Sequence, residues 1–179
     1  AQPLSNALTQ GSDSVQFAEY RGQLHWFWGD TNLIRYPLGI FQMPGAVSPR
    51  PENAKLDIEQ GINLTYFQDD KGAARNTAEM PGEGPTWVSG VTVVSDKNGR
   101  EQMIAGYTKI RGTLEVYRRG LCRWNDERQA FDDLGAVAEE TANFPIGHPL
   151  EHSADDKKWI YYCEPLPILR VPATAESVL

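Results

Sequence analysis

Residues 15–28, which read VQFAEYRGQLHWFW, decide the fold class of this chain. Apolar and aromatic residues fill two short runs, Val15 to Tyr20 and Leu24 to Trp28, on either side of Arg21-Gly22-Gln23. Aromatic and β-branched residues favour strands, and a short turn that contains glycine joins antiparallel neighbours. The stretch therefore predicts a β-hairpin.

Three further pairs of strand-like runs repeat this layout along the chain. Their turns are rich in Asp, Asn and Gly, as in Asp96-Lys97-Asn98-Gly99, and such residues accept positive φ. The expected pairs are Trp87–Val94 with Met103–Ile110, Leu114–Trp124 with Ala130–Val137, and Pro149–His152 with Trp159–Cys163. The best helical stretch, Ala136 to Ala142, is too short to support a helical domain. An all-β fold follows.

Two segments between the hairpins are rich in proline and glycine. The longer one runs from Asn32 to Leu56 and contains four prolines, so we expect an irregular excursion without a central strand. Loops of this length in compact domains are often functional. The second segment, Met80 to Thr86, has the same character.

A repeated unit sets the expected architecture. The segments Asp13 to Asp30, Trp87 to Lys109 and His148 to Glu164 share a strand, a turn and an aromatic strand, and Leu114 to Val137 adds two strands to the second. Four antiparallel strands per unit are typical of a β-propeller blade, and a β-sandwich is the alternative. We treat residues 1–179 as a single all-β domain with about three blades. A closed ring needs at least about four, so we expect further blades in a longer protein or in a partner chain.

Composition narrows the choice of partners. The formal net charge of −7 repels phosphate backbones, which argues against nucleic acid, whereas neutral sugars are compatible with it. No run of 18 apolar residues predicts a membrane span. The two cysteines, Cys122 and Cys163, lie in predicted strands and outside any zinc-ligand spacing, so we expect buried free thiols. Ala1-Gln2-Pro3 carries no signal sequence, so such a leader was either removed or never present.

The hairpin region resembles a known family of enzymes. Residues 13–28 are similar to the first-blade signature of five-bladed propeller glycosidases, glycoside hydrolase family 43 and its relatives, and Trp28-Gly29-Asp30-Thr31 resembles a motif of related arabinan-cleaving propellers. The stretch is also similar to uncharacterised secreted bacterial proteins. The resemblance implies a carbohydrate-active propeller with carboxylates gathered at its axis, and an extracellular or periplasmic location.

The resemblance also implies which residues form the site. Family 43 enzymes use an Asp base, a second Asp that tunes it and a Glu acid, and Asp13 matches the base by its place before the strand. The family's Asp-Pro is Asp13-Ser14 here, and no acid directly precedes Trp87 or Pro149, so a complete acidic trio is not evident. Glu83 is the acid nearest to Trp87.

Hairpin geometry supplies an independent argument for two of these acids. Asp13 and Asp30 flank the open end of the predicted hairpin, so they are expected on the same side of the sheet. The catalytic candidates are Asp13, Asp30 and Glu83, and the candidates for substrate binding are Arg35, Tyr36, Trp87, Arg111 and His148. No metal site or cofactor is expected, although a structural calcium ion on the axis is left open. Two hypotheses follow: a glycoside hydrolase, or a non-catalytic module that binds glycans or proteins.

Overall fold

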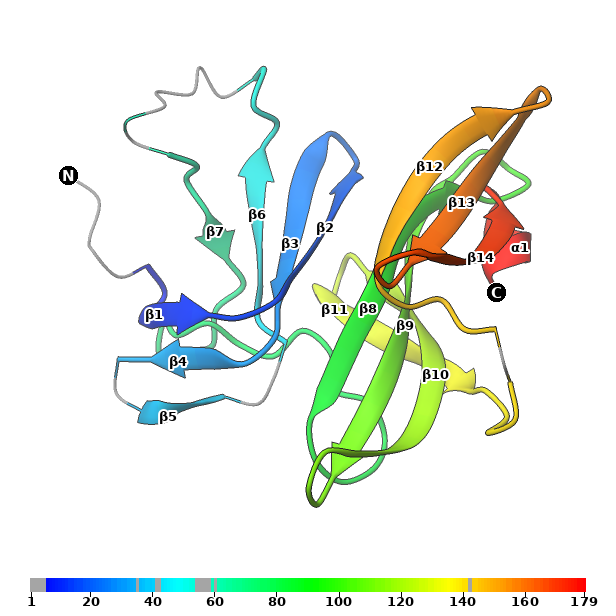
Figure 1. Ribbon diagram of the computed structural model, residues 1–179. Coiled ribbons are helices and arrows are strands. Elements are labelled where there is room, and N and C mark those ends of the chain that lie inside the picture. Colours follow the sequence, from blue (N-terminus) through cyan, green and yellow to red (C-terminus); the bar gives the residue numbers. More distant parts are fainter. Residues whose placement is uncertain (1–5, 35, 41–42, 54–58, 60, 142) are drawn as a thin grey trace. The chain divides into compact units, whose positions relative to one another are not determined.

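The chain folds into two compact units, residues 1–78 and 79–179. The computed structural model describes residues 6–34, 36–40, 43–53, 59, 61–141 and 143–179. In the part of the chain so described, each unit contains one four-stranded and one three-stranded antiparallel sheet (Figure 1).

The four-stranded sheet of the first unit is built on the predicted hairpin. Its strands lie in the order β2 (Val15–Tyr20), β3 (Gln23–Trp28), β6 (Gly45–Pro49) and β7 (Thr65–Tyr66). Val15 pairs with Trp28 and Tyr20 with Gln23. The two turn residues, Arg21 and Gly22, both have positive φ, 50° and 76°. Positive φ at both central positions produces a turn whose twist matches the flanking strands, and the predicted hairpin is confirmed.

The proline-rich stretch corrects one prediction. We expected no central strand between Asn32 and Leu56, yet β6 lies between β3 and β7. Pro44 precedes this strand and Pro49 ends it, so proline occupies none of its inner positions and the ladder keeps its N–H donors. The same stretch also contributes to a small sheet of β1 (Thr9–Ser12), β4 (Thr31–Leu33) and β5 (Tyr36–Ile40).

The four-stranded sheet of the second unit is a consecutive meander. It runs β8 (Thr86–Ser95), β9 (Glu101–Arg111), β10 (Glu115–Asn125) and β11 (Ala130–Ala136), each strand paired with the next. In the β8–β9 turn the Asp96 carboxylate accepts hydrogen bonds from the N–H groups of Asn98 and Arg100, at 2.8 and 3.0 Å. These bonds, that of Arg100 first, lower the pKa of Asp96. The β8–β9 and β10–β11 pairings confirm the two hairpins that were predicted within this sheet.

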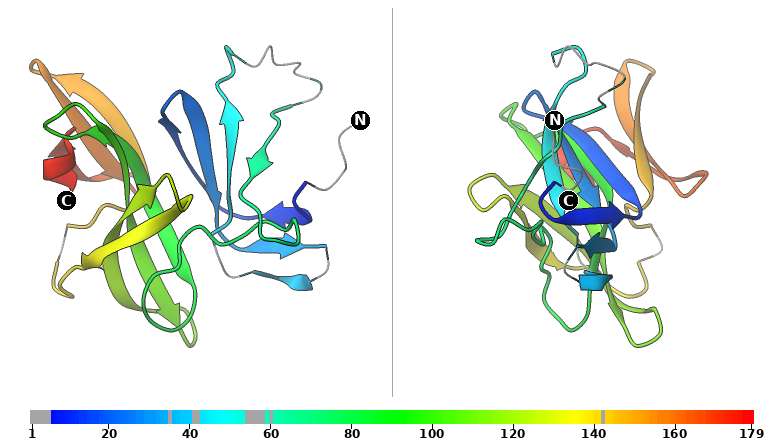
Figure 2. Two further views of the ribbon diagram at one scale, coloured as in Figure 1. Left: turned by 180° about the vertical axis from the view of Figure 1, so that it is seen from behind. Right: turned by 90° about the vertical axis from the view of Figure 1, so that its left-hand side faces the viewer.

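The last sheet of the second unit has three strands and a short helix beside it. Strands β12 (His148–Ala154), β13 (Lys157–Cys163) and β14 (Pro167–Pro172) pair in order, and α1 (Ala175–Val178) follows (Figure 2). The stretch with the best helical pattern in the sequence, Ala136 to Ala142, forms no helix over residues 136–141. Ala136 still belongs to β11, and the Val137 N–H donates to the Arg119 carbonyl at 2.9 Å, which prolongs the ladder.

The two sheets of the second unit share one apolar core. Val94 and Ile104 on the four-stranded sheet pack with Ile160 and Tyr162 on β13, and with Ala175 and Val178 of α1. Cys122 is buried in β10 and Cys163 half-buried in β13, and both are free thiols. The prediction of free thiols is confirmed for both residues, and the prediction of burial is confirmed for Cys122.

A bulge in β8 provides a polar connection between the same two sheets. Pairing with β9 shifts between Ser89 and Thr92. There the Gly90 N–H donates to the Gly147 carbonyl at 2.9 Å, and the Gly147 N–H donates to the Ser89 hydroxyl at 2.7 Å. Gly90 has φ +66°, and a Cβ at this position would lie 2.8 Å from the Pro145 carbonyl oxygen. Only glycine fits so close an approach in that conformation.

The coarse fold class is confirmed: the chain is all-β, with several small antiparallel sheets. Each four-stranded sheet pairs its strands in meander fashion, as a propeller blade does. The third predicted blade, which begins at His148, has three strands where four were expected. The sheet of β1, β4 and β5 was not predicted. The arrangement of blades around an axis and the single domain stay predictions.

Candidate functional site

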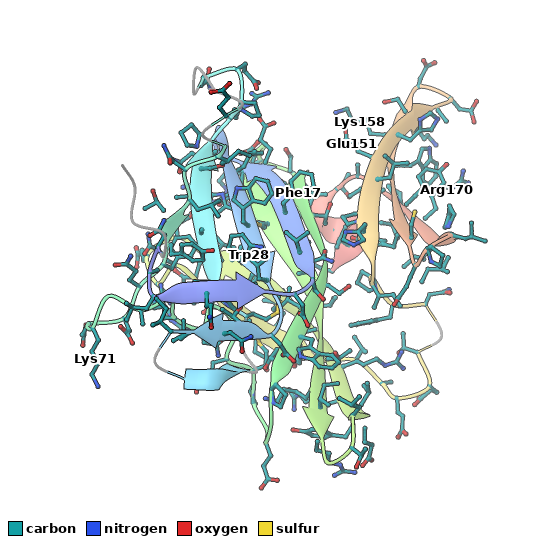
Figure 3. The ribbon with its side chains drawn as sticks, turned by 60° about the vertical axis from the view of Figure 1, so that its left-hand side comes forward. Phe17, Trp28, Lys71, Glu151, Lys158 and Arg170 are labelled. Carbon is teal, nitrogen blue, oxygen red and sulfur yellow. The ribbon has the colours of Figure 1, made fainter. Side chains whose placement is uncertain are left out.

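A row of aromatic side chains covers one face of the β2–β3–β6–β7 sheet. The ring centroids of Phe17 and Trp26 are 5.5 Å apart, those of Trp26 and Trp28 6.5 Å, and those of Trp28 and Tyr66 5.3 Å. The ring planes meet at 29°, 9° and 29° in the same order, so successive rings are nearly parallel. Figure 3 shows Phe17 and Trp28 over these strands. We call Phe17, Trp26, Trp28 and Tyr66 the aromatic face.

Strand alternation explains why the rings gather there. Side chains of successive strand residues point to opposite faces, so Trp26 and Trp28 share one face, whereas His25 and Phe27 lie on the other. Phe27 is 0% exposed and Phe17 is 56% exposed, which identifies the buried and the open face. The Trp26 indole N–H donates to the Ser48 hydroxyl at 2.9 Å and so fixes the ring.

The aromatic face combines accessibility with order. Trp26, Trp28 and Tyr66 are half-buried, and burial raises the pKa of the Tyr66 hydroxyl, which therefore stays protonated at neutral pH. Rings that neighbouring rings hold in place lose little conformational freedom when a ligand binds. Such a surface can pack against the apolar face of a flat ligand, and its indole and phenol groups provide polar edges.

Two of the predicted acids meet at one end of this sheet. The Asp13 N–H donates to the Asp30 carbonyl at 3.0 Å, and the Gly29 N–H donates to the Asp13 carbonyl at 3.1 Å. Asp13 is exposed and Asp30 half-buried. A Cβ on Gly29 would lie 2.7 Å from Asp13 Oδ1, so the carboxylate rests directly on this glycine. The two acids thus lie beside Trp28, at the end of the hairpin where the sequence places them.

Hydroxyl groups brace the segments that carry these acids. The side-chain oxygens of Ser12 and Thr31 are 2.8 Å apart, and the Thr31 hydroxyl donates to the Gly29 carbonyl at 3.0 Å. Thr31 is fully buried. The backbone around Asp13 and Asp30 is therefore ordered by contacts that do not use either carboxylate.

Other predicted site residues belong to the second unit. Glu83 is exposed, and its carbonyl accepts a hydrogen bond from the Tyr117 hydroxyl at 2.8 Å. Trp87 is half-buried in β8. Arg111 forms an exposed ion pair with Glu115 at 2.8 Å, and this contact lowers the pKa of Glu115. The structure therefore gives Arg111 a local partner.

Three predicted residues are not placed in a site. His148 is exposed, opens β12 and pairs with Cys163 across the ladder. Arg35 lies outside the described residues, and so does the side chain of Tyr36, whose backbone begins β5. Asp13 and Asp30 are the predicted acids that the structure brings together.

A polar cluster around the buried Tyr107 in the second unit was not predicted from the sequence; its partners Arg118 and Asp133 are partly exposed. The Tyr107 hydroxyl donates to Asp133 at 2.8 Å and accepts from Arg118 Nε at 3.1 Å, and Arg118 pairs with Asp133 at 3.3 Å. Tyr107 is 0% exposed, and burial raises its pKa. A Cβ on Gly120 would lie 2.4 Å from the Tyr107 ring, so glycine makes room for it. The three polar groups satisfy one another, which is what a structural network requires.

Lys109 is the second buried polar group that sequence reasoning missed. It is 3% exposed, and its ammonium donates to the Gly84 carbonyl and to the Thr86 hydroxyl. Burial lowers its pKa. The sequence signal was only a lysine near the end of a predicted strand. Its contacts hold the glycine- and proline-rich loop against β9.

Neither a cluster of metal ligands nor a membrane-spanning helix is found among the residues that the structure describes. Within residues 6–34, 36–40, 43–53, 59, 61–141 and 143–179, no three His, Cys, Asp or Glu side chains gather as metal ligands would. Among helices in that same part of the chain, none has the length and apolar character needed to cross a bilayer.

Comparisons with known proteins give one distant structural likeness. No protein-family model matches the sequence, and no curated protein matches it. Among solved structures, the chain is similar to an exo-β-1,3-galactanase from Phanerochaete chrysosporium crystallised with β-1,3-galactotriose, at a TM-score of 0.49 and 8% identity. The match covers 83% of this chain and 31% of the galactanase chain. These values are too low to show a shared fold.

Proposed function

We propose that this protein binds carbohydrate, with a neutral glycan lying on the aromatic face. The observation that carries the proposal is the partly exposed row of Phe17, Trp26, Trp28 and Tyr66, in which Trp28 directly precedes the Gly29–Asp30 segment that is hydrogen-bonded to Asp13. Pyranose rings present C–H groups on one face and hydroxyls at the rim. Apolar stacking next to hydrogen-bonding carboxylates therefore suits their chemistry.

Charge and exposure support a neutral sugar chain as the ligand. The net charge of −7 disfavours polyanionic ligands at a distance. Phe17 is the open end of the row at 56% exposure, so we expect the first stacking contact there. Asp13, exposed at the open end of the hairpin, is positioned to accept hydrogen bonds from sugar hydroxyls.

Glycoside hydrolysis is the second candidate function. Two carboxyl groups roughly 5 to 9.5 Å apart can cleave a glycosidic bond when one is protonated and the other ionised. The backbone bridge between Asp13 and Asp30 supports this pair, and the resemblance of residues 13–31 to family 43 propellers supports the reaction type. In this proposal the protein is a propeller enzyme that works outside the cytoplasm.

Binding is tested with a panel of neutral plant and algal polysaccharides by affinity electrophoresis, followed by calorimetry on oligosaccharides of the best ligand. Phe17→Ala and Trp28→Ala should each weaken binding at least tenfold. Leu150→Ala is the matched control, because Leu150 is a 60% exposed apolar residue on β12 of the other unit. The proposal fails if the unmodified protein retains no polysaccharide, or if both aromatic variants bind as well as the control.

Hydrolysis is tested by reducing-sugar release from the same panel. Asp13→Asn and Asp30→Asn should each lower release at least a hundredfold while retention in the affinity gel is kept. Both substitutions preserve side-chain size, and thermal unfolding of each variant checks its fold. Release by the unmodified protein that neither substitution reduces would remove this pair from the mechanism. Retention without any release would leave carbohydrate binding as the function.

A further inference from the structure

The face of the β12–β14 sheet that points away from its core carries a second set of rings. Strand β13 turns Tyr162 into the core, so the alternation of side chains puts Trp159 and Tyr161 on the opposite face, where both are half-buried. Across the ladders, His152 of β12 lies opposite Trp159. Arg170 of β14 lies opposite Tyr161. We call His152, Trp159, Tyr161 and Arg170 the outer face; neither proposed function uses it.

Arg170 lies over the rings of the outer face without an acidic partner. Its guanidinium carbon is 4.2 Å from the centroid of the Trp159 ring and 5.9 Å from that of Tyr161. Its Nη1 group donates to the Tyr161 hydroxyl at 3.3 Å. Among the residues that the structure describes, no carboxylate pairs with this guanidinium, so its other N–H groups are available to a ligand.

Two other arginines that lie over rings in the second unit have acceptors of their own. Arg111 lies over a tyrosine ring and pairs with Glu115 at 2.8 Å. Arg119 lies over a phenylalanine ring and donates to two backbone carbonyls, at 2.7 and 3.2 Å. Stacking alone therefore does not distinguish Arg170. What distinguishes it is a stacked, exposed guanidinium whose only acceptor in the described part of the chain is a neutral hydroxyl.

The charge of the outer face favours an anionic group. Within β12, β13 and β14, all of which the structure describes, the one acid is Glu151, and alternation puts it on the other side of the sheet, where it pairs with Lys158 at 2.9 Å. Figure 3 shows Arg170 and the pair of Glu151 and Lys158 on opposite sides of these strands. Asp155 and Asp156 lie in the turn, outside the ladder. Arg170 is thus an uncompensated cation on a chain of net charge −7.

The contacts of Arg170 suit it to a forked interaction with a carboxylate. Guanidinium and carboxylate groups are both planar, and two parallel N–H···O bonds can join them. Rings beneath the guanidinium restrict its rotamers, so less conformational freedom is lost on binding. The outer face is centred on β13, the middle strand, so side chains and not the backbone of a sheet edge meet the ligand. An extended peptide uses such an edge, whereas a compact ring does not need it.

From these observations we propose that the outer face binds a uronate, a pyranose sugar that carries a carboxylate, as an isolated unit of an otherwise neutral glycan. The carboxylate accepts the fork of Arg170, the C–H face of the pyranose lies against Tyr161, and His152 bonds a sugar hydroxyl. An isolated uronate fits the net charge of −7, which repels a polyuronate at a distance. This site lies in the other unit from the aromatic face, so it does not depend on the proposed function.

The experiment compares methyl β-glucuronide with methyl β-glucoside, which share the pyranose ring and differ in a carboxylate against a hydroxymethyl group. Acetate is the third probe and offers a carboxylate without a ring. Each is titrated into ¹⁵N-labelled protein at constant ionic strength, and the Trp159 indole and Tyr161 amide resonances report binding. We expect the glucuronide to bind at least tenfold more tightly than the glucoside or acetate. Arg170→Gln should lower its affinity to that of the glucoside.

Two variants separate the outer face from net charge and from the aromatic face. Lys71→Gln removes one exposed positive charge from the first unit, so it changes the net charge as Arg170→Gln does, and it should leave the affinity for the glucuronide unchanged. Phe17→Ala should also leave it unchanged. Arg170 is exposed, so its replacement should keep the fold, and thermal unfolding checks this.

The proposal is overturned if the unmodified protein shows no shift of these resonances with the glucuronide. Equal affinity for the glucuronide and the glucoside would remove the role of the carboxylate, and equal affinity for acetate would remove the role of the sugar ring; either result overturns the proposal. So does an Arg170→Gln variant that folds and keeps the affinity for the glucuronide.

Discussion

The four-stranded sheets of the two units are both antiparallel, but they differ in how many of their faces are buried. In the first unit, β3 buries His25 and Phe27 on one side and leaves Trp26 and Trp28 partly open on the other. In the second unit, β9 is buried on both sides from Met103 to Tyr107. The first sheet exposes aromatic rings to solvent, whereas the second buries Lys109 and Tyr107, and Tyr107 bonds to the partly exposed Arg118 and Asp133.

This difference shows that strand topology does not place the candidate binding surface. What places it is which face a sheet leaves uncovered, and which side chains the period of two puts there. The polar groups that the second sheet buries, Tyr107 and Lys109, are hydrogen-bonded within their own unit and contribute to its stability. The following predictions test this division between an open functional face and an enclosed structural one.

The largest expected effect comes from the buried face of the first sheet. Phe27→Ala removes a ring that is 0% exposed, and should lower the free energy of unfolding by about 3 to 5 kcal/mol through lost burial and a cavity. Urea denaturation followed by tryptophan fluorescence measures it. A loss below about 1 kcal/mol would mean that this face is not a packed core.

The polar cluster around the buried Tyr107 should give an intermediate effect. Tyr107→Phe keeps the ring but removes the hydroxyl that joins Arg118 to Asp133. We expect a loss of about 1 to 3 kcal/mol, because charged partners are left with fewer hydrogen bonds. Chemical denaturation at pH 7 is the measurement. Unchanged stability would show that water replaces the Tyr107 hydroxyl as the partner of Arg118 and Asp133.

The buried Tyr162, on β13 of the same unit, should make the free energy of unfolding fall at alkaline pH. Burial raises the pKa of Tyr162 above its ordinary 10.0, so the unfolded chain releases this proton first. The stabilising contribution is complete below pH 10 and is lost as the pH rises through the folded pKa. Between pH 8 and about pH 10.5, ionisation of Tyr162 in the unfolded chain should lower the free energy of unfolding by about 1 kcal/mol. Tyr162→Phe should reduce the pH-dependent loss by that amount in urea titrations; an identical slope would contradict it.

The smallest effect on stability belongs to the open face. Phe17→Ala removes a ring that is 56% exposed and should change the free energy of unfolding by less than about 1 kcal/mol. It is the matched partner of Phe27→Ala, on the same sheet and with the same change of side chain. Equal losses for the two phenylalanines would erase the distinction between the faces.

The hairpins were predictable because their information is local. Residues 15–28 carry both strands and the turn, and the observed pairing of Val15 with Trp28 follows from a two-residue connection. The meeting of Asp13 with Asp30 follows from that register. Strand β6 was missed because proline was counted over the whole segment from Asn32 to Leu56, whereas only the positions within the ladder matter.

The remaining features depend on contacts between distant residues. Tyr66 joins the aromatic face through pairing of β7 with β6, and nothing near Tyr66 in the sequence indicates that neighbour. Lys109 and Tyr107 read as ordinary strand residues until the loop at Gly84 and the bulged β11 supply their partners. Asp13 and Asp30 are local to one hairpin, which is why sequence reasoning could place them and could not place Glu83 beside them.

The bulge at Gly90 has a consequence for the order in which the second unit folds. The β8–β9 and β10–β11 hairpins close over a few residues, which takes microseconds. The hydrogen bonds that tie Ser89 and Gly90 to Gly147 join positions 58 and 57 apart along the chain, and closing so large a loop carries an entropic penalty before any contact offsets it. The meander from β8 to β11 should therefore acquire protected amides early in refolding, and the β12–β14 sheet should dock onto it in a later step.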